Sequence, residues 1–67
     1  MKLWIARDTK GDLFVFDHKP VEEHWSHDDV FYECESDHCL WLGKDAYPEI
    51  TFENSPQEVE LKFSINQ

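Results

Sequence analysis

Two histidines and two cysteines near the middle of the chain are the side chains best suited to bind a metal ion. His24 and His27 have two residues between them, and Cys34 and Cys39 have four. Two imidazoles and two thiolates suit tetrahedral zinc, but the cysteines of a zinc finger are usually closer together and precede the histidines. We therefore favour no metal site and expect no cofactor. A small zinc-binding domain that uses these four side chains is the alternative.

The cysteines also have interpretations that need no metal. If residues 30–34 and 39–42 pair as a hairpin, Cys34 faces Cys39 and the two sulfur atoms lie close together. They would then be buried, unreactive thiols, or a disulfide that a reducing cytosol would not preserve. The sequence leaves these alternatives open.

Few residues suggest catalysis. Cys34 with His38 could act as a nucleophile and its base, and Asp28 with Asp29 as an acid pair. Adjacent residues of an extended segment point to opposite faces, so the two aspartates would not converge. A chain of 67 residues rarely encloses a pocket that excludes water. We predict that the protein is not an enzyme and assign no catalytic residue.

Aromatic side chains are the best candidates for binding. Trp4, Phe14 and Phe16, joined by Trp25 or Trp41, would form a large apolar surface if they were left open. Such surfaces often mark interfaces, where tryptophan and tyrosine contribute strongly to affinity. The alternative is that these residues form the core. We predict a protein-interaction domain that binds another protein, or a second copy of itself as a homodimer, through Trp4, Phe14 and Phe16.

The chain is strongly acidic, with 15 Asp and Glu, 6 Lys and Arg, and a net charge of −9. This charge disfavours direct contact with nucleic acids or anionic membranes, and favours a basic protein or a cation. Acidic surface that keeps a small protein soluble is the simplest explanation. A further alternative is an inhibitor that imitates nucleic acid, with carboxylates from residues 22–37 and from Glu58 and Glu60.

A hairpin over residues 2–17 must position the aromatic residues. Two alternating segments, 3–7 and 13–17, flank a turn in which Asp8 accepts from backbone amides and Gly11 takes a positive φ. Both faces of this hairpin are apolar, so both require cover. The expected register pairs Trp4 with Phe16, Ile5 with Val15 and Ala6 with Phe14.

The next residues are expected to form a loop and a second hairpin. Residues 20–29 show no clean periodicity and predict a loop, from which Trp25 folds back onto the first hairpin. Residues 30–34 and 39–42 predict the second hairpin, with Tyr32 facing Trp41.

The last third of the chain is expected to contain turns and two strands. We predict turns at 44–48 and 54–56 around a short strand at 50–52. Ser55 and Pro56 resemble a helix start, but the alternating apolar positions that follow favour a strand. These positions are Val59, Leu61, Phe63 and Ile65. The sequence therefore predicts one all-β domain over residues 1–67, an antiparallel meander of five to six short strands with at most one helical turn.

No apolar stretch approaches the roughly 20 residues that span a bilayer, and the first residues do not form a signal peptide. We expect a cytoplasmic protein.

Two segments carry specific motifs. Residues 4–8 read Trp-Ile-Ala-Arg-Asp and precede Gly11, Leu13 and Lys19-Pro20; residues 47–53 read Tyr-Pro-Glu-Ile-Thr-Phe-Glu and precede Ser55-Pro56 and Glu-Val-Glu-Leu at 58–61. In these motifs the chain resembles a group of short proteins from bacteria and their phages. The resemblance covers roughly half of the chain and is weakest over residues 21–43. It implies a compact, stand-alone, intracellular domain and assigns no functional residue.

Overall fold

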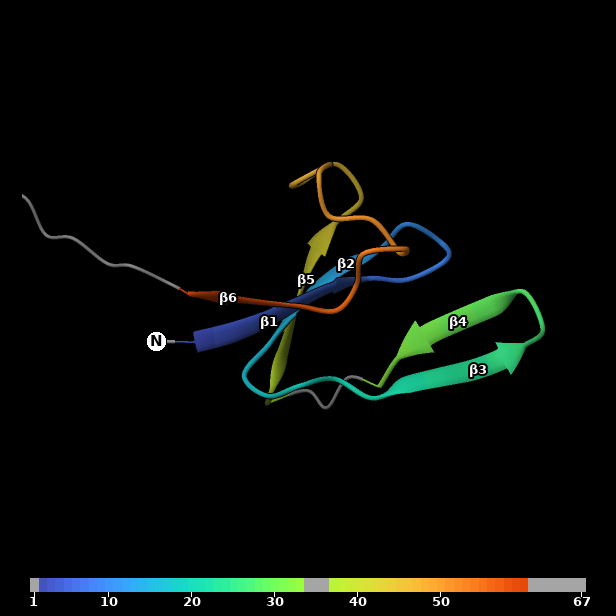
Figure 1. Ribbon diagram of the computed structural model, residues 1–67, viewed down its shortest axis with the longest axis horizontal. Coiled ribbons are helices and arrows are strands. Elements are labelled where there is room, and N and C mark those ends of the chain that lie inside the picture. The colour runs from blue at the N-terminus through green and yellow to red at the C-terminus, as the bar shows by residue number, and fades with distance from the viewer. Residues whose placement is uncertain (1, 34–36, 61–67) are drawn as a thin grey trace, which may run out of the picture.

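The computed structural model describes residues 2–33 and 37–60, which form two antiparallel β-sheets (Figure 1). The first sheet has four strands in the order β5-β2-β1-β6, and the second is the hairpin β3-β4. The strands are β1 (Lys2–Arg7), β2 (Leu13–Phe16), β3 (Glu22–Ser26), β4 (Asp29–Tyr32), β5 (Cys39–Gly43) and β6 (Gln57–Glu60). The all-β prediction is confirmed. The described residues contain no helix long and apolar enough to cross a membrane.

The predicted β1–β2 hairpin is present with the expected turn. The Oδ1 atom of Asp8 accepts hydrogen bonds from the backbone amides of Lys10 (2.9 Å) and Asp12 (3.0 Å). Gly11 has a φ of 93°, a conformation that residues with a Cβ atom rarely adopt. The register is also confirmed: Trp4 pairs with Phe16, Ile5 with Val15, and Ala6 with Phe14.

Each face of the β1–β2 hairpin packs into a separate core cluster, because side chains alternate between the two faces of a strand. The first cluster contains the buried residues Ile5, Leu13 and Ile50. The second contains Ala6, Phe16 and Tyr32. Later segments of the chain therefore cover both faces of the β1–β2 hairpin. This cover is required because both faces are apolar and would otherwise be exposed to water.

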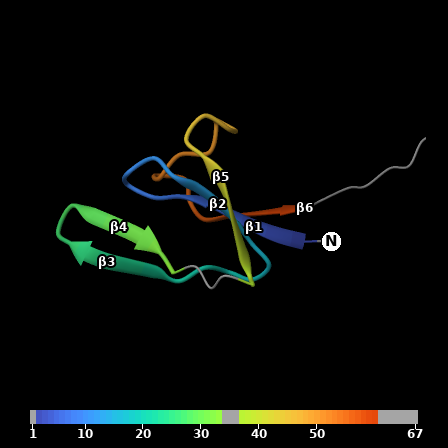
Figure 2. The ribbon, with the colours of Figure 1, turned by 180° about the vertical axis from the view of Figure 1, so that it is seen from behind.

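The strand pairing in the middle of the chain differs from the prediction. Residues 20–29 are not a loop, because β3 occupies part of this stretch and pairs with β4. The predicted second hairpin is also wrong, since residues 39–42 belong to β5, which pairs with β2. Every residue of β3 is exposed, so no alternation of buried and exposed positions marks it as a strand in the sequence. Figure 2 shows the β3–β4 hairpin beside the turn of the β1–β2 hairpin and apart from the four-stranded sheet.

The segment between β5 and β6 is not a strand, so the predicted strand at 50–52 is wrong. Backbone hydrogen bonds close turns there, from the amide of Ile50 to Tyr47 (2.9 Å) and from that of Ser55 to Phe52 (3.2 Å), near the predicted turns. Ile50 is nevertheless buried in the first core cluster. Side-chain donors from Arg7 replace strand pairing in this segment, since its Nε atom donates to the Ile50 carbonyl at 2.6 Å.

The predicted last strand is confirmed as far as the described residues reach. β6 pairs antiparallel with β1, and Glu58 and Glu60 are exposed while Val59 is half-buried. Leu61, Phe63 and Ile65 lie outside the described residues. Ser55 does not begin a helix; its Oγ atom accepts a 2.9 Å hydrogen bond from the backbone amide of Arg7.

Candidate protein-binding groove

A groove of about 430 Å³ lies between the turn of the β1–β2 hairpin and the β3–β4 hairpin. We call it the hairpin groove. Most of its lining residues are aromatic or acidic, and the full set is Asp8, Lys10, Asp12, Phe14, Trp25, Asp29, Val30, Phe31 and Tyr32. These residues come from two hairpins that are not paired with each other, so the groove exists only because the hairpins are held side by side.

Thr9, at the tip of the first turn, joins the two hairpins. Its backbone amide donates to the carbonyl oxygen of Val30 at 3.2 Å. Its Oγ atom accepts from the Val30 amide at 3.0 Å and lies 3.2 Å from Oδ1 of Asp29. Tyr32 adds an apolar contact, because its ring packs against Phe16 with centroids 6.4 Å apart. These contacts fix β4 against the β1–β2 hairpin.

The aromatic part of the groove includes two exposed rings. Trp25 is 78% exposed, and Phe31 is also exposed. Their rings contact each other edge to face, with centroids 6.1 Å apart. Phe14 is half-buried and contributes from the first hairpin. Exposed apolar rings at the edge of a groove are commonly buried by a protein partner.

Acidic side chains supply most of the charge in the hairpin groove. Asp8 is only 8% exposed, and two backbone amides stabilise its Oδ1 atom. Asp12 accepts from the Trp41 indole at 3.2 Å and lies 3.7 Å from the ammonium of Lys44. Asp29 is half-buried beside Thr9. Lys10 is the single basic residue in the lining, so carboxylates outnumber cations.

The hydroxyl group of Tyr32 is buried without a hydrogen-bond partner among the described residues. The residue is 3% exposed, whereas a buried tyrosine hydroxyl normally finds a partner. Burial raises the pKa of Tyr32, and the negative charges of Glu22 and Asp8 raise the pKa further. The hydroxyl therefore stays protonated and is able to donate one hydrogen bond and accept others.

The three aromatic residues predicted to bind a partner have different surroundings. Phe16 is 0% exposed and belongs to the core, so it cannot touch a partner. Trp4 is half-buried, and the ammonium of Lys19 lies 5.6 Å from the centre of its ring. Phe14 is the member of the trio that lines the hairpin groove. Trp25 lies at this groove too, but it is exposed on β3 instead of covering the first hairpin from a loop.

The candidate zinc ligands that the structure describes, His24, His27 and Cys39, are not grouped around one site. The Nε2 atom of His24 lies 3.0 Å from Oε1 of Glu22 on β3, and His27 is exposed in the next turn. Cys39 lies on β5 of the other sheet and is disulfide-bonded, so its sulfur is not an available thiolate. Cys34 lies outside the described residues. Within residues 2–33 and 37–60, no three His, Cys, Asp or Glu side chains are arranged to hold a metal ion.

A bridge of two histidines and one aspartate was not predicted from the sequence. The Oδ1 atom of Asp17 lies 2.7 Å from Nδ1 of His18, and its Oδ2 atom lies 2.8 Å from Nδ1 of His38. The hydrogen bond with His18, and next the one with His38, lowers the pKa of Asp17. His38 is thus engaged with this carboxylate, and Cys34, the nucleophile considered with it in the sequence, lies outside the described residues. The bridge links the end of β2 to the residues before β5.

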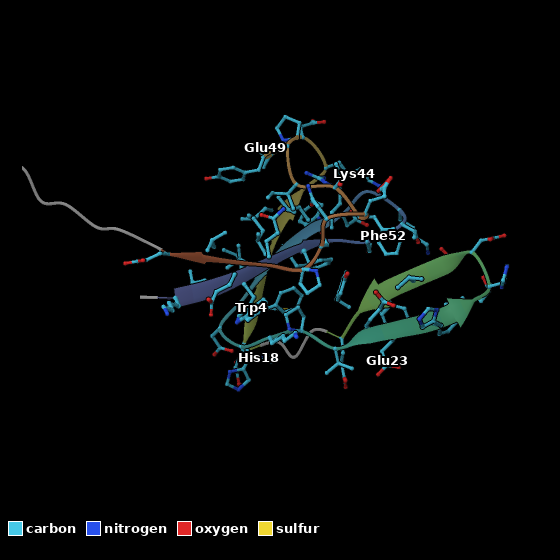
Figure 3. All side chains as sticks on the ribbon, viewed as in Figure 1. Trp4, His18, Glu23, Lys44, Glu49 and Phe52 are labelled. Carbon is cyan, nitrogen blue, oxygen red and sulfur yellow. The ribbon has the colours of Figure 1, made fainter. Side chains whose placement is uncertain are left out.

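The acidic residues considered for nucleic-acid mimicry lie on different elements. Glu58 and Glu60 are on β6, at one edge of the four-stranded sheet, whereas Glu22 and Glu23 are on β3 of the separate hairpin. Figure 3 shows Glu23 on the β3–β4 hairpin, away from β6. These four carboxylates therefore lie on two different sheets.

Comparison with protein families, with curated proteins and with solved structures finds no match to this chain.

Proposed function

We propose that this protein is a small acidic protein-interaction domain that contacts its partner through the hairpin groove. The observation that carries the proposal is the exposure of Trp25, 78% of whose surface is open to water at the rim of the groove. Tryptophan is the residue type most enriched among the side chains that dominate binding energy at interfaces. Burying Trp25 and Phe31 against a partner would remove a large apolar area from water.

Charge favours a basic partner over a second copy of the chain. Two copies would each bring a net charge of −9, and the groove itself carries more carboxylates than cations. Like charges brought together at an interface oppose association, whereas a basic surface would be attracted. Sedimentation velocity over a dilution series measures self-association directly. A dimer that dissociates when Trp25 is replaced by serine would instead assign the groove to the homodimer.

Capture of partners on immobilised protein tests the proposal. The baits are the wild-type protein, Trp25→Ser, and a matched control, Tyr47→Asn. Tyr47 is also an exposed aromatic residue, and asparagine tolerates its positive φ of 48°. We expect wild type and Tyr47→Asn to retain the same protein and Trp25→Ser to lose it.

Retention of that protein by Trp25→Ser would contradict a role for the hairpin groove. Circular dichroism of the three baits must show the same fold, because Trp25 is exposed and its replacement should not affect the core. Competition by duplex DNA for the same partner would indicate that the acidic surface acts as the nucleic-acid mimic considered above, whereas elution by salt is expected of any basic partner.

A further inference from the structure

We propose that the hairpin groove binds a single positively charged side chain, an arginine of the partner protein. This inference rests on the proposed function, because it names the group that enters the same groove. Three features support it: an unpartnered hydroxyl, an excess of carboxylates and exposed aromatic rings.

The hydroxyl of Tyr32 is the first feature. Among the described residues it is the one buried side-chain polar atom without a hydrogen-bond partner. A buried polar group left unpaired destabilises a fold, so an external partner for this hydroxyl would offset the loss. A guanidinium group has five N–H donors and could donate to the hydroxyl oxygen.

The carboxylates of Asp8 and Asp29 are the second feature. Both line the groove, and the negative charge of Asp8 acts on the Tyr32 hydroxyl. Asp12 is already compensated by Lys44 at 3.7 Å. Asp8 is held mainly by backbone amides, which orient the carboxylate without cancelling its charge. A cation close to Tyr32 would therefore meet negative charge on the turn and on β4.

The exposed rings are the third feature. Trp25 and Phe31 lie at the same groove, and the guanidinium of arginine stacks on aromatic faces while its edge donates hydrogen bonds. A cation–π contact already occurs elsewhere in this protein, where the ammonium of Lys19 lies 5.6 Å from the ring centre of Trp4. An anion or a neutral apolar side chain would use the rings but would leave Asp8 and Asp29 uncompensated.

Titration of the protein with one short peptide tests this inference. The probe is a five-residue peptide with blocked ends and one central arginine between threonines; its control has citrulline, which keeps the shape of arginine but lacks the charge. The readout is the NMR signal of the Trp25 indole N–H, with that of Trp4 as the internal reference. We expect the arginine peptide to shift the Trp25 signal and the citrulline peptide to bind at least about tenfold more weakly.

Four variants locate the charge effect. Asp29→Asn keeps an acceptor for Thr9 but removes the charge, and should weaken binding at least about threefold. Tyr32→Phe should weaken binding about fivefold without loss of stability. Lys10→Gln should strengthen binding, because it removes the cation from the lining. Glu49→Gln is the control, since Glu49 lies on the loop between β5 and β6, away from the β3–β4 hairpin (Figure 3).

The possible failures are distinct. Equal binding of the arginine and citrulline peptides would overturn the cation inference and leave the groove as an apolar contact surface. Equal weakening by Asp29→Asn and Glu49→Gln would also overturn it, because the attraction would then be a property of the whole acidic surface. Absence of any shift at Trp25 would overturn it as well. The capture experiment with Trp25→Ser still decides the proposed function in each case.

Discussion

The Nε–H group of Arg7 donates a 2.6 Å hydrogen bond to the carbonyl oxygen of Ile50, which lies 43 positions further along the chain. Among the described residues, the two Nη atoms of Arg7 also donate only to backbone carbonyls. These acceptors are Gly11 (2.7 Å), Lys44 (3.1 Å), Ala46 (2.7 Å) and Tyr47 (3.0 Å). In a chain with 15 acidic residues, this arginine thus holds the loop between β5 and β6 by its backbone.

Replacement of this side chain in Arg7→Lys should destabilise the protein by about 2–4 kcal/mol, because an ammonium lacks the planar fork of five donors. Urea denaturation measures the change. The converse swap at an exposed position, Lys2→Arg, is the control and should change stability by less than about 0.5 kcal/mol. An Arg7→Lys variant as stable as Lys2→Arg would show that the carbonyl contacts contribute little in solution.

The turn between β1 and β2 should be sensitive to substitution of Gly11 because of its backbone conformation. Apart from Gly11 and its two chain neighbours, no heavy atom lies within 4 Å of the position that a Cβ atom would take there, so a larger side chain would not clash with the rest of the fold. Gly11→Ala should still cost about 1–2 kcal/mol, because φ is 93°. Gly11→Asn should cost less, since asparagine tolerates positive φ better than alanine. Equal stability of all three proteins by urea denaturation would contradict this explanation.

Local sequence signals predicted the first hairpin, because an aspartate, a glycine and two alternating segments lie within a few residues of one another. The contacts made by Arg7 had no such signal, since its acceptors are carbonyl groups that every residue carries. β3 was missed because all its residues are exposed. The hairpin groove depends on the contact between Thr9 and Val30, which are 21 residues apart. The sequence therefore indicated the aromatic and acidic residues of the groove, but it did not predict that they lie together.

The bridge formed by Asp17 should make stability sensitive to acid. Its hydrogen bonds with His18 and then His38 place the pKa of Asp17 below the ordinary value of 3.8. A lowered pKa in the folded state means that the ionised form stabilises the fold above pH 3.8 and that this contribution disappears as the pH falls through the folded pKa. Asp17→Asn should therefore be less stable than wild type near neutral pH, and the difference should vanish in strong acid.

Urea denaturation between about pH 6 and pH 2 checks this prediction. Asp45→Asn is the matched control, because Asp45 is exposed and has no hydrogen bond in the described part of the chain. A gap between wild type and Asp17→Asn that stays constant down to the lowest pH would contradict the role of the ionised carboxylate.

The buried hydroxyl of Tyr32 should make stability sensitive to alkali. Burial, Glu22 and Asp8 raise the pKa of Tyr32 above 10.0 in the folded protein. The unfolded chain then loses this proton first, so the stability contributed by the protonated hydroxyl is complete below pH 10.0 and is lost as the pH rises through the folded pKa. Tyr32→Phe should lack this loss, and below pH 10.0 it should be at least as stable as wild type, because removing an unpaired buried hydroxyl breaks no hydrogen bond. Tyr47→Asn, which removes the exposed tyrosine instead, should keep the alkaline loss. Urea denaturation from about pH 8 to pH 11 compares the three proteins, and identical alkaline profiles for wild type and Tyr32→Phe would show that the hydroxyl is solvated.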